Sequence, residues 1–138
     1  MKNTLLLALV TVAVLIAACG SNSSTTGAVI KTAAVGNNLT VILSNTDGVL
    51  RNGDNDFFVS FKDTSGKTVE VGAVGLNFYM PPMGTMPAMN NAATFTTTGT
   101  PGIYQGKVKL ESAGDWQAQL TYEGTAGKGK TSFAVTAQ

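Results

Sequence analysis

Short apolar runs separated by turn residues extend through most of the chain. In residues 57–61 (FFVSF), Phe57, Val59 and Phe61 alternate with other residues and would share one face of a strand. Dipeptides such as Asn52-Gly53 mark turns between the runs. No stretch shows the apolar spacing of a three-turn helix. The pattern predicts strands at residues 29–33, 39–43, 57–61, 68–71, 75–80, 94–98, 103–110, 116–122 and 130–136.

These runs predict an all-β domain. About seven to nine short strands, with a turn signal every ten or so residues, are typical of an immunoglobulin-like sandwich of two sheets. The single tryptophan, Trp116, is expected to pack between the sheets. The 120 residues after Ala18 are enough for one domain with one core. We therefore expect a β-sandwich domain at residues 28–138.

The beginning of the chain has a different pattern. Lys2 precedes fourteen apolar or small residues, 5–18, whereas a membrane-spanning helix needs about 20. This length, followed by small residues, is typical of a secretory signal peptide. The polar segment that ends at Gly27 (SNSSTTG, from Ser21) has no apolar periodicity. We predict a signal peptide at residues 1–18, export from the cytoplasm, and a flexible tether at residues 19–27.

The end of the apolar run resembles a bacterial lipobox. Residues 15–19 read LIAAC, and the resemblance implies cleavage before Cys19, acylation of its thiol and anchoring to a membrane. Cys19 is the only cysteine, so the chain has no intrachain disulfide, and lipidation explains the unpaired thiol. Because Gly20 follows Cys19, the resemblance also implies the outer membrane, facing the periplasm, if the cell is Gram-negative. An ordinary signal peptide with an incidental cysteine is the alternative.

Charge and composition exclude several classes of function. Lys2 is one of nine basic residues and would be removed with the signal peptide. The mature chain would then contain eight basic and eight acidic residues. A net charge of zero argues against a nucleic-acid partner, which requires a basic surface. The chain has no histidine, which excludes Ser-His-Asp and Cys-His catalysis and histidine-based zinc or copper sites.

Other polar residues do not indicate a catalytic or calcium site. The carboxylates Asp54, Asp56 and Glu111 have no spacing that indicates an acid–base pair, and we interpret them as surface charges. Residues 53–56 (GDND) lack the alternating ligands and the closing Glu of a calcium loop. We predict no catalytic residues and no enzymatic activity.

One decapeptide carries the candidate binding chemistry. Every methionine other than Met1 lies in residues 80–89 (MPPMGTMPAM), at intervals of three. A thioether is a neutral, polarisable donor that suits Cu(I) and, by the same softness, Ag(I). It does not titrate, so it would serve in an acidic compartment. The candidate metal ligands are Met80, Met83, Met86 and Met89.

The prolines of this segment favour a polyproline II conformation. Pro81, Pro82 and Pro87 have fixed φ angles, and polyproline II repeats every three residues, which would place methionines on one edge about 9 Å apart. Gly84 must then permit a bend if three sulfurs are to reach one ion. Two other interpretations remain open: the segment fills one end of the sandwich, or it forms an apolar patch that docks a partner protein.

The region around this segment resembles the YtkA-like domain, which is related to the FixH-like group. The similarity covers about residues 39–135. It rests on the Met-Pro segment after a strand, on residues 101–104 (PGIY) and on residues 113–116 (AGDW). It implies an immunoglobulin-like sandwich outside the cytoplasm and a link to copper handling, heavy-metal efflux or cytochrome oxidase assembly. The four methionines are then the candidate ligands, whereas Ser112 stands where members often have a further methionine.

Together these features predict a non-catalytic module tethered to a membrane by lipid. We expect it to act as a carrier or buffer for Cu(I) or Ag(I), with a metal-efflux or oxidase-assembly protein as partner. The alternative is a structural domain that binds no metal and whose Met/Pro loop docks an envelope protein.

Overall fold

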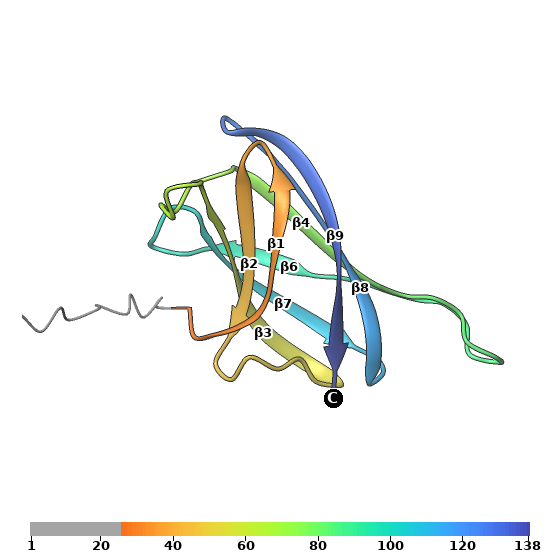
Figure 1. Cartoon of the computed structure of the whole chain (residues 1–138). Coiled ribbons are helices and arrows are strands. Elements are labelled where there is room, and N and C mark those ends of the chain that lie inside the picture. The colour runs from red at the N-terminus through yellow and green to blue at the C-terminus, as the bar shows by residue number, and fades with distance from the viewer. Residues whose placement is uncertain (1–25) are drawn as a thin grey trace, which may run out of the picture.

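The computed structural model describes residues 26–138 and contains only strands and connecting segments in that part of the chain. Nine strands follow one another (Figure 1). They are β1 (Ala28–Gly36), β2 (Leu39–Asn45), β3 (Gly53–Lys62), β4 (Ala73–Met80), β5 (Met89–Ala92), β6 (Thr94–Thr97), β7 (Ile103–Leu110), β8 (Gly114–Gly124) and β9 (Gly127–Ala137). Within this range no helix has the length and apolar character needed to cross a bilayer.

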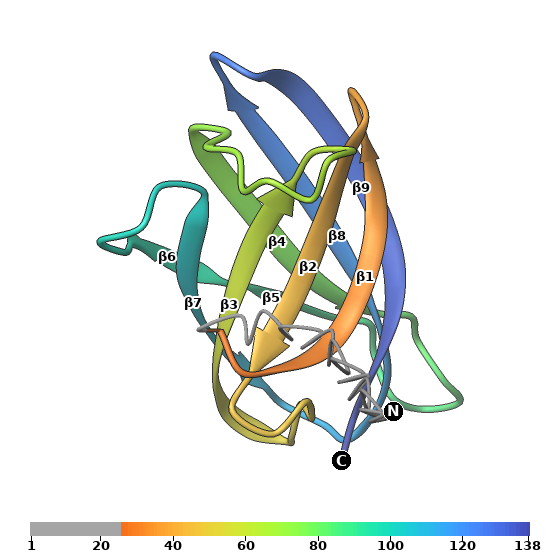
Figure 2. The same ribbon diagram turned by 60° about the vertical axis from the view of Figure 1, so that its left-hand side comes forward.

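The strands form two antiparallel sheets. One sheet has the order β1-β2-β3-β7-β6 and the other has the order β5-β4-β8-β9. Figure 2 shows the layer of β1, β2 and β3 lying over the layer of β4, β8 and β9. The predicted all-β sandwich of two sheets is confirmed, and the number of strands is at the upper end of the predicted range.

Alternation along the strands builds the core between the layers. In β8 the residues Trp116, Ala118, Leu120 and Tyr122 are buried, and the residues between them are exposed. In β3 the predicted face of Phe57, Val59 and Phe61 is buried completely. Because side chains alternate across a strand, one apolar face of each sheet meets the other in a single core.

Aromatic rings join the two sheets. The ring of Phe57 in β3 packs edge to face against Phe78 in β4 of the other sheet, with centroids 6.1 Å apart, and against Phe95 in β6 of its own sheet at 5.9 Å. Trp116 is 1% exposed, as expected for a residue between the sheets. Its indole N–H donates a hydrogen bond of 3.0 Å to the carbonyl of Ser112, which satisfies the one polar group of the ring.

Residues 68–71 do not form the predicted strand. Thr68 makes only an isolated bridge to Lys62. The hydroxyl of Tyr104 accepts backbone N–H groups from Val71 and Gly72 at 3.2 Å, so a side chain replaces the partner strand that these groups would otherwise need. The strand prediction for this segment is therefore wrong, although Val71 is fully buried as an apolar residue.

The chain passes from one sheet to the other between β5 and β6. β5 pairs with β4, and β6 pairs with β7 in the opposite sheet. Ala93 lies between them and donates its N–H to the carbonyl of Leu76 at 2.9 Å. The sequence did not predict β5, because its four residues (MNNA) include two asparagines and show no apolar alternation. β5 is one arm of the hairpin that carries the candidate methionines.

The chain packs against the sandwich just before β1. β1 starts at Ala28, but Thr26, within the expected tether, is already buried at 5% exposure. A β-carbon on Gly27 would lie 2.2 Å from the carbonyl oxygen of Asn45, so this glycine packs tightly against the end of β2. The predicted signal peptide and the lipidation site at Cys19 lie outside the described residues.

Candidate functional site

The four candidate methionines lie on one hairpin between β4 and β5. Met80, the last residue of β4, is opposite Met89, the first residue of β5. Met83 is opposite Met86 in an isolated antiparallel bridge closer to the turn. Both pairs belong to a single hairpin register, so the structure brings the methionines together in two pairs and does not form a polyproline rod.

A two-residue turn closes this hairpin. The N–H of Met83 donates to the carbonyl of Met86 at 3.1 Å, and the N–H of Met86 donates to the carbonyl of Met83 at 2.9 Å. Gly84 is the first central residue and has a φ of 58°. A positive φ at this position is typical of a type II′ turn, which a glycine adopts without steric cost. Gly84 thus has a turn-forming role, related to the bend that the sequence required.

The prolines lie where the hairpin needs no ladder hydrogen bonds. Pro81, Pro82 and Pro87 are exposed and fall between the two methionine pairs, outside the strands. Proline lacks a backbone N–H, so it is tolerated at these positions and would not be within the β4–β5 ladder. The prolines therefore separate the pair Met83 and Met86 from the pair Met80 and Met89.

The two pairs differ in their accessibility to solvent. Met83 is 54% exposed and Met86 is 44% exposed, whereas Met80 is 1% exposed. Met89 is half-buried and packs against the core. Figure 1 shows the end of this hairpin, in green, extending beyond the body of the sandwich. We call Met83 and Met86 the tip pair, and Met80 and Met89 the base pair.

Met80 of the base pair lies beside Gly114, where β8 begins after its preceding loop. A β-carbon built on Gly114 would be 3.4 Å from the Cε atom of Met80. This loop includes Ser112, whose carbonyl holds the indole of Trp116. Ser112, where the family resemblance implies a methionine, therefore lies two residues before the glycine that is beside Met80.

The geometry of the tip pair suits a soft cation. Opposite residues that exchange both backbone hydrogen bonds have α-carbons about 5.5 Å apart and side chains on the same face. Methionine has three rotatable side-chain bonds, which allow two such thioethers to reach one ion. Among residues 26–138, no group of three or more His, Cys, Asp or Glu side chains is placed to hold a metal ion. The methionine hairpin is the metal-binding candidate that the sequence predicted.

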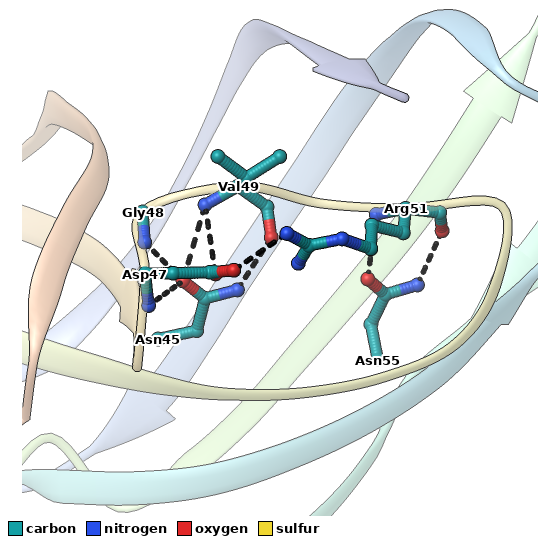
Figure 3. Close-up of polar contacts among 6 residues, drawn as sticks. All are labelled: Asn45, Asp47, Gly48, Val49, Arg51 and Asn55. Carbon is teal, nitrogen blue, oxygen red and sulfur yellow. Dashed lines mark hydrogen bonds and ion pairs between the residues drawn. The ribbon is translucent and has the colours of Figure 1, made fainter.

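Two asparagine side chains form hydrogen bonds with the backbone of the polar loop between β2 and β3 (Figure 3). The side-chain oxygen of Asn45 accepts the N–H of Gly48 at 2.6 Å and that of Val49 at 3.2 Å. The side-chain oxygen of Asn55 accepts the N–H of Arg51 at 2.8 Å, and its side-chain nitrogen donates to the carbonyl of Arg51 at 2.7 Å. These amide oxygens are engaged in shaping the loop, which gives them a structural role.

Two carboxylates in and beside this loop, those of Asp47 and Asp56, form ion pairs. Arg51 contacts Asp47 at 2.7 Å, and this hydrogen bond lowers the pKa of the Asp47 carboxyl below its ordinary value of 3.8. Lys107 contacts Asp56 at 3.1 Å on the rim of an open depression of about 500 Å³. Both pairs are well exposed to solvent, so each contributes little to stability. These charges form an ordinary solvated surface.

Comparison with known proteins supports the resemblance in sequence. The YtkA-like family model matches residues 33–121, which covers more than half of the chain and includes the whole methionine hairpin. Searches among curated proteins and among solved structures found no significant match. The chain therefore belongs to the YtkA-like family.

Proposed function

We propose that this protein is a non-catalytic, membrane-tethered module that holds Cu(I) or Ag(I) as cargo in its methionine hairpin. The observation that supports this proposal is the tip pair: two thioethers opposite each other, exposed, on a turn that extends beyond the sandwich (Figure 1). Neither methionine of the tip pair belongs to the core cluster, so packing in the core does not explain them.

The donor set selects the class of cargo. Thioether sulfur is soft and uncharged, which favours monovalent Cu(I) and Ag(I) over Zn²⁺, Ca²⁺ or Mg²⁺. Met83 and Met86 provide two donors from the tip. Met89 is half-buried at the base, and we assign it as the candidate for a third donor. Met80 is 1% exposed, so we assign its main role to packing.

A site with few donors at an exposed tip suits transfer better than storage. A partner can approach the tip without contacting the sandwich and add its own sulfur ligands to the ion. Ligand exchange of this kind requires no opening of the core. The family resemblance points to a metal-efflux or oxidase-assembly protein as the partner.

The tether is a separate part of the proposal. Acylation of Cys19 would hold the domain at a membrane outside the cytoplasm, and several acyl chains would make the attachment stable. The test is the fractionation of cells that express the chain or its Cys19→Ala variant. We expect the wild-type chain in the membrane fraction and the variant in the soluble extracytoplasmic fraction. Identical distribution of the two proteins would refute lipid anchoring at Cys19.

Metal binding is tested by competition for Cu(I). The full-length chain, kept in mild detergent under anaerobic conditions, is titrated against a chromophoric Cu(I) chelator beside a variant with Met83 and Met86 changed to leucine. Leucine keeps the apolar volume and removes the sulfur. We expect the variant to bind Cu(I) at least about tenfold more weakly, a difference of about 1.4 kcal/mol. Equal binding by the two proteins would contradict the proposal.

The second candidate function is a docking domain that binds no metal. The exposed Met and Pro residues of the tip form an apolar surface, and methionine adapts well to a partner's shape. The leucine variant separates the two functions, because a docking surface tolerates leucine and a metal site does not. Retained partner capture by the leucine variant, without Cu(I) binding by either protein, would favour docking.

A further inference from the structure

The fold exposes two methionine sulfurs and shields a third on the same hairpin. Met83 and Met86 are 54% and 44% exposed, and Met80, three residues before Met83, is 1% exposed. Every residue from 81 to 88 is exposed, and nothing lies within 4 Å of a β-carbon built on Gly84. Small oxidants in solvent therefore have free access to the tip pair, and the core excludes them from Met80.

We propose that Met83 and Met86 form a reversible oxidation site. The oxidant belongs to the peroxide or hypohalous-acid class, and the product at each residue is methionine sulfoxide. The partner that restores the thioether is a sulfoxide-reducing enzyme, which can reach an extended hairpin without unfolding the domain. This modification depends only on accessibility and does not require that the site bind metal.

The reaction with hydrogen peroxide balances at each sulfur. A lone pair of the thioether attacks one peroxide oxygen, an S–O bond forms and the O–O bond breaks. The departing hydroxide takes a proton and leaves as water. Sulfur loses two electrons and the peroxide oxygens gain them. Reduction by a dithiol enzyme returns the oxygen as water and leaves a disulfide on the enzyme.

Oxidation at the tip leaves the sandwich intact. The two hydrogen bonds that close the turn are between backbone atoms, so neither depends on sulfur. The tip pair also lies outside the core cluster, whereas Met80 belongs to it. A sulfoxide oxygen at Met80 would be buried without a partner, which destabilises a fold. The placement of the methionines thus separates a tolerated oxidation from a damaging one.

Oxidation would also change the binding chemistry of the tip, an effect that rests on the proposed function. A sulfoxide replaces a soft, apolar donor with a polar group that carries a hard oxygen donor. The oxidised tip pair would then release Cu(I) or Ag(I). Oxidant in the surrounding compartment would thereby control whether the hairpin holds its cargo.

The test is a time course of oxidation by hydrogen peroxide. The full-length chain is treated in its folded state and, as a control, in denaturant, and peptide mass mapping follows the gain of oxygen at each methionine. We expect Met83 and Met86 to oxidise at least about tenfold faster than Met80 when folded, and all of them to oxidise at similar rates when unfolded. Equal rates for Met80 and the tip pair in the folded chain would overturn the proposal.

Two further measurements complete the test. The denaturation midpoint of the tip-oxidised chain should match that of the untreated chain, and purified methionine sulfoxide reductases with dithiol should restore both residues in the folded protein. A lowered midpoint or no reduction would overturn the proposal of a reversible site. Ag(I) affinity before and after oxidation tests the link to cargo. An untreated chain that binds no Ag(I) would defeat the proposed function alone, since the oxidation rates are measured without metal.

Discussion

Met83 and Met86 face each other across the turn at Gly84 and Thr85, and each donates its backbone N–H to the carbonyl of the other, at 3.1 and 2.9 Å. This reciprocal pairing fixes the two side chains on one face of the hairpin. The spacing of the methionines is symmetric about this turn, so the same register that joins Met83 to Met86 also joins Met80 to Met89.

Substitution of Met80 in the base pair and of Met83 in the tip pair should affect the stability of the fold differently. Met80 is buried in the core and Met83 is largely exposed, although both carry the same side chain. We expect Met80→Ala to lower the free energy of unfolding by about 2–5 kcal/mol because it leaves a cavity. Met83→Ala should change it by no more than about 0.5 kcal/mol. Urea denaturation of the two variants checks this, and similar losses of stability in both would contradict the division.

The turn itself should be sensitive to a β-carbon at Gly84. An L-residue at a φ of 58° is strained by about 1–2 kcal/mol, and no neighbouring atom adds a clash. We expect Gly84→Ala to weaken Ag(I) binding by several-fold and to lower the free energy of unfolding by no more than this strain, because the turn lies outside the core cluster.

The control for this variant is Gly99→Ala. Gly99 also has nothing within 4 Å of a built β-carbon, but its φ lies outside the left-handed range. Isothermal titration with Ag(I) compares the two variants with the wild-type chain. If Gly84→Ala and Gly99→Ala bind Ag(I) alike, the geometry of the turn does not organise the site.

The packing of Phe57 predicts that Gly106 cannot be enlarged. A β-carbon on Gly106 would lie 2.3 Å from one ring carbon of Phe57 and 2.4 Å from another. The ring cannot move aside freely, because it also packs edge to face against Phe78 and Phe95. We expect Gly106→Ala to destabilise the fold by about 1–3 kcal/mol. A thermal unfolding midpoint equal to that of Gly99→Ala would contradict this account of the core.

Sequence patterns predicted the strands best where one face is uniformly apolar. The predicted range 103–110 coincides with β7, and the alternating residues of β3 are buried as expected. The strand predicted at residues 68–71 does not form. The hydroxyl of Tyr104 accepts the backbone N–H groups of Val71 and Gly72, and no local sequence pattern reveals this contact between distant segments. β5 was missed because its four residues include two asparagines and show no apolar alternation, although they pair with β4 across the hairpin.

The methionine segment was identified from its composition, but its conformation was not. The three prolines favoured polyproline II, whereas the structure places them between two methionine pairs in an antiparallel hairpin. A Gly-Thr dipeptide at the centre of a symmetric sequence is a signal for a two-residue turn. Local proline preferences and this signal compete, and the pairing of β4 with β5 favours the hairpin.

The decrease in the free energy of unfolding at acidic pH should depend in part on Asp63. The hydroxyl of Ser65 donates to its carboxylate at 2.6 Å and the N–H of Lys67 donates at 3.0 Å, and these bonds lower the pKa of Asp63 below its ordinary value of 3.8. The ionised carboxylate therefore stabilises the folded chain at pH values above the ordinary pKa of 3.8. This stabilisation is lost as the pH falls through the lowered pKa of the folded state.

Comparison with Asp63→Asn measures this contribution. The wild-type chain should exceed the variant in unfolding free energy near neutral pH, and the difference should shrink as the pH falls below about 4. Urea denaturation at a series of pH values between about 2 and 7 provides the data. A difference that stays constant across the series would exclude a contribution from the ionised carboxylate.

The most direct test of the account observes each methionine during metal binding. The full-length chain, labelled with ¹³C at the methionine methyl groups, is titrated with Ag(I), and single Met→Leu variants assign the signals. We predict that the methyl signals of Met83 and Met86 shift first and together, and that the signal of Met80 stays in place. Unchanged signals from the tip pair, at Ag(I) concentrations that saturate the chain, would contradict a metal site at this hairpin.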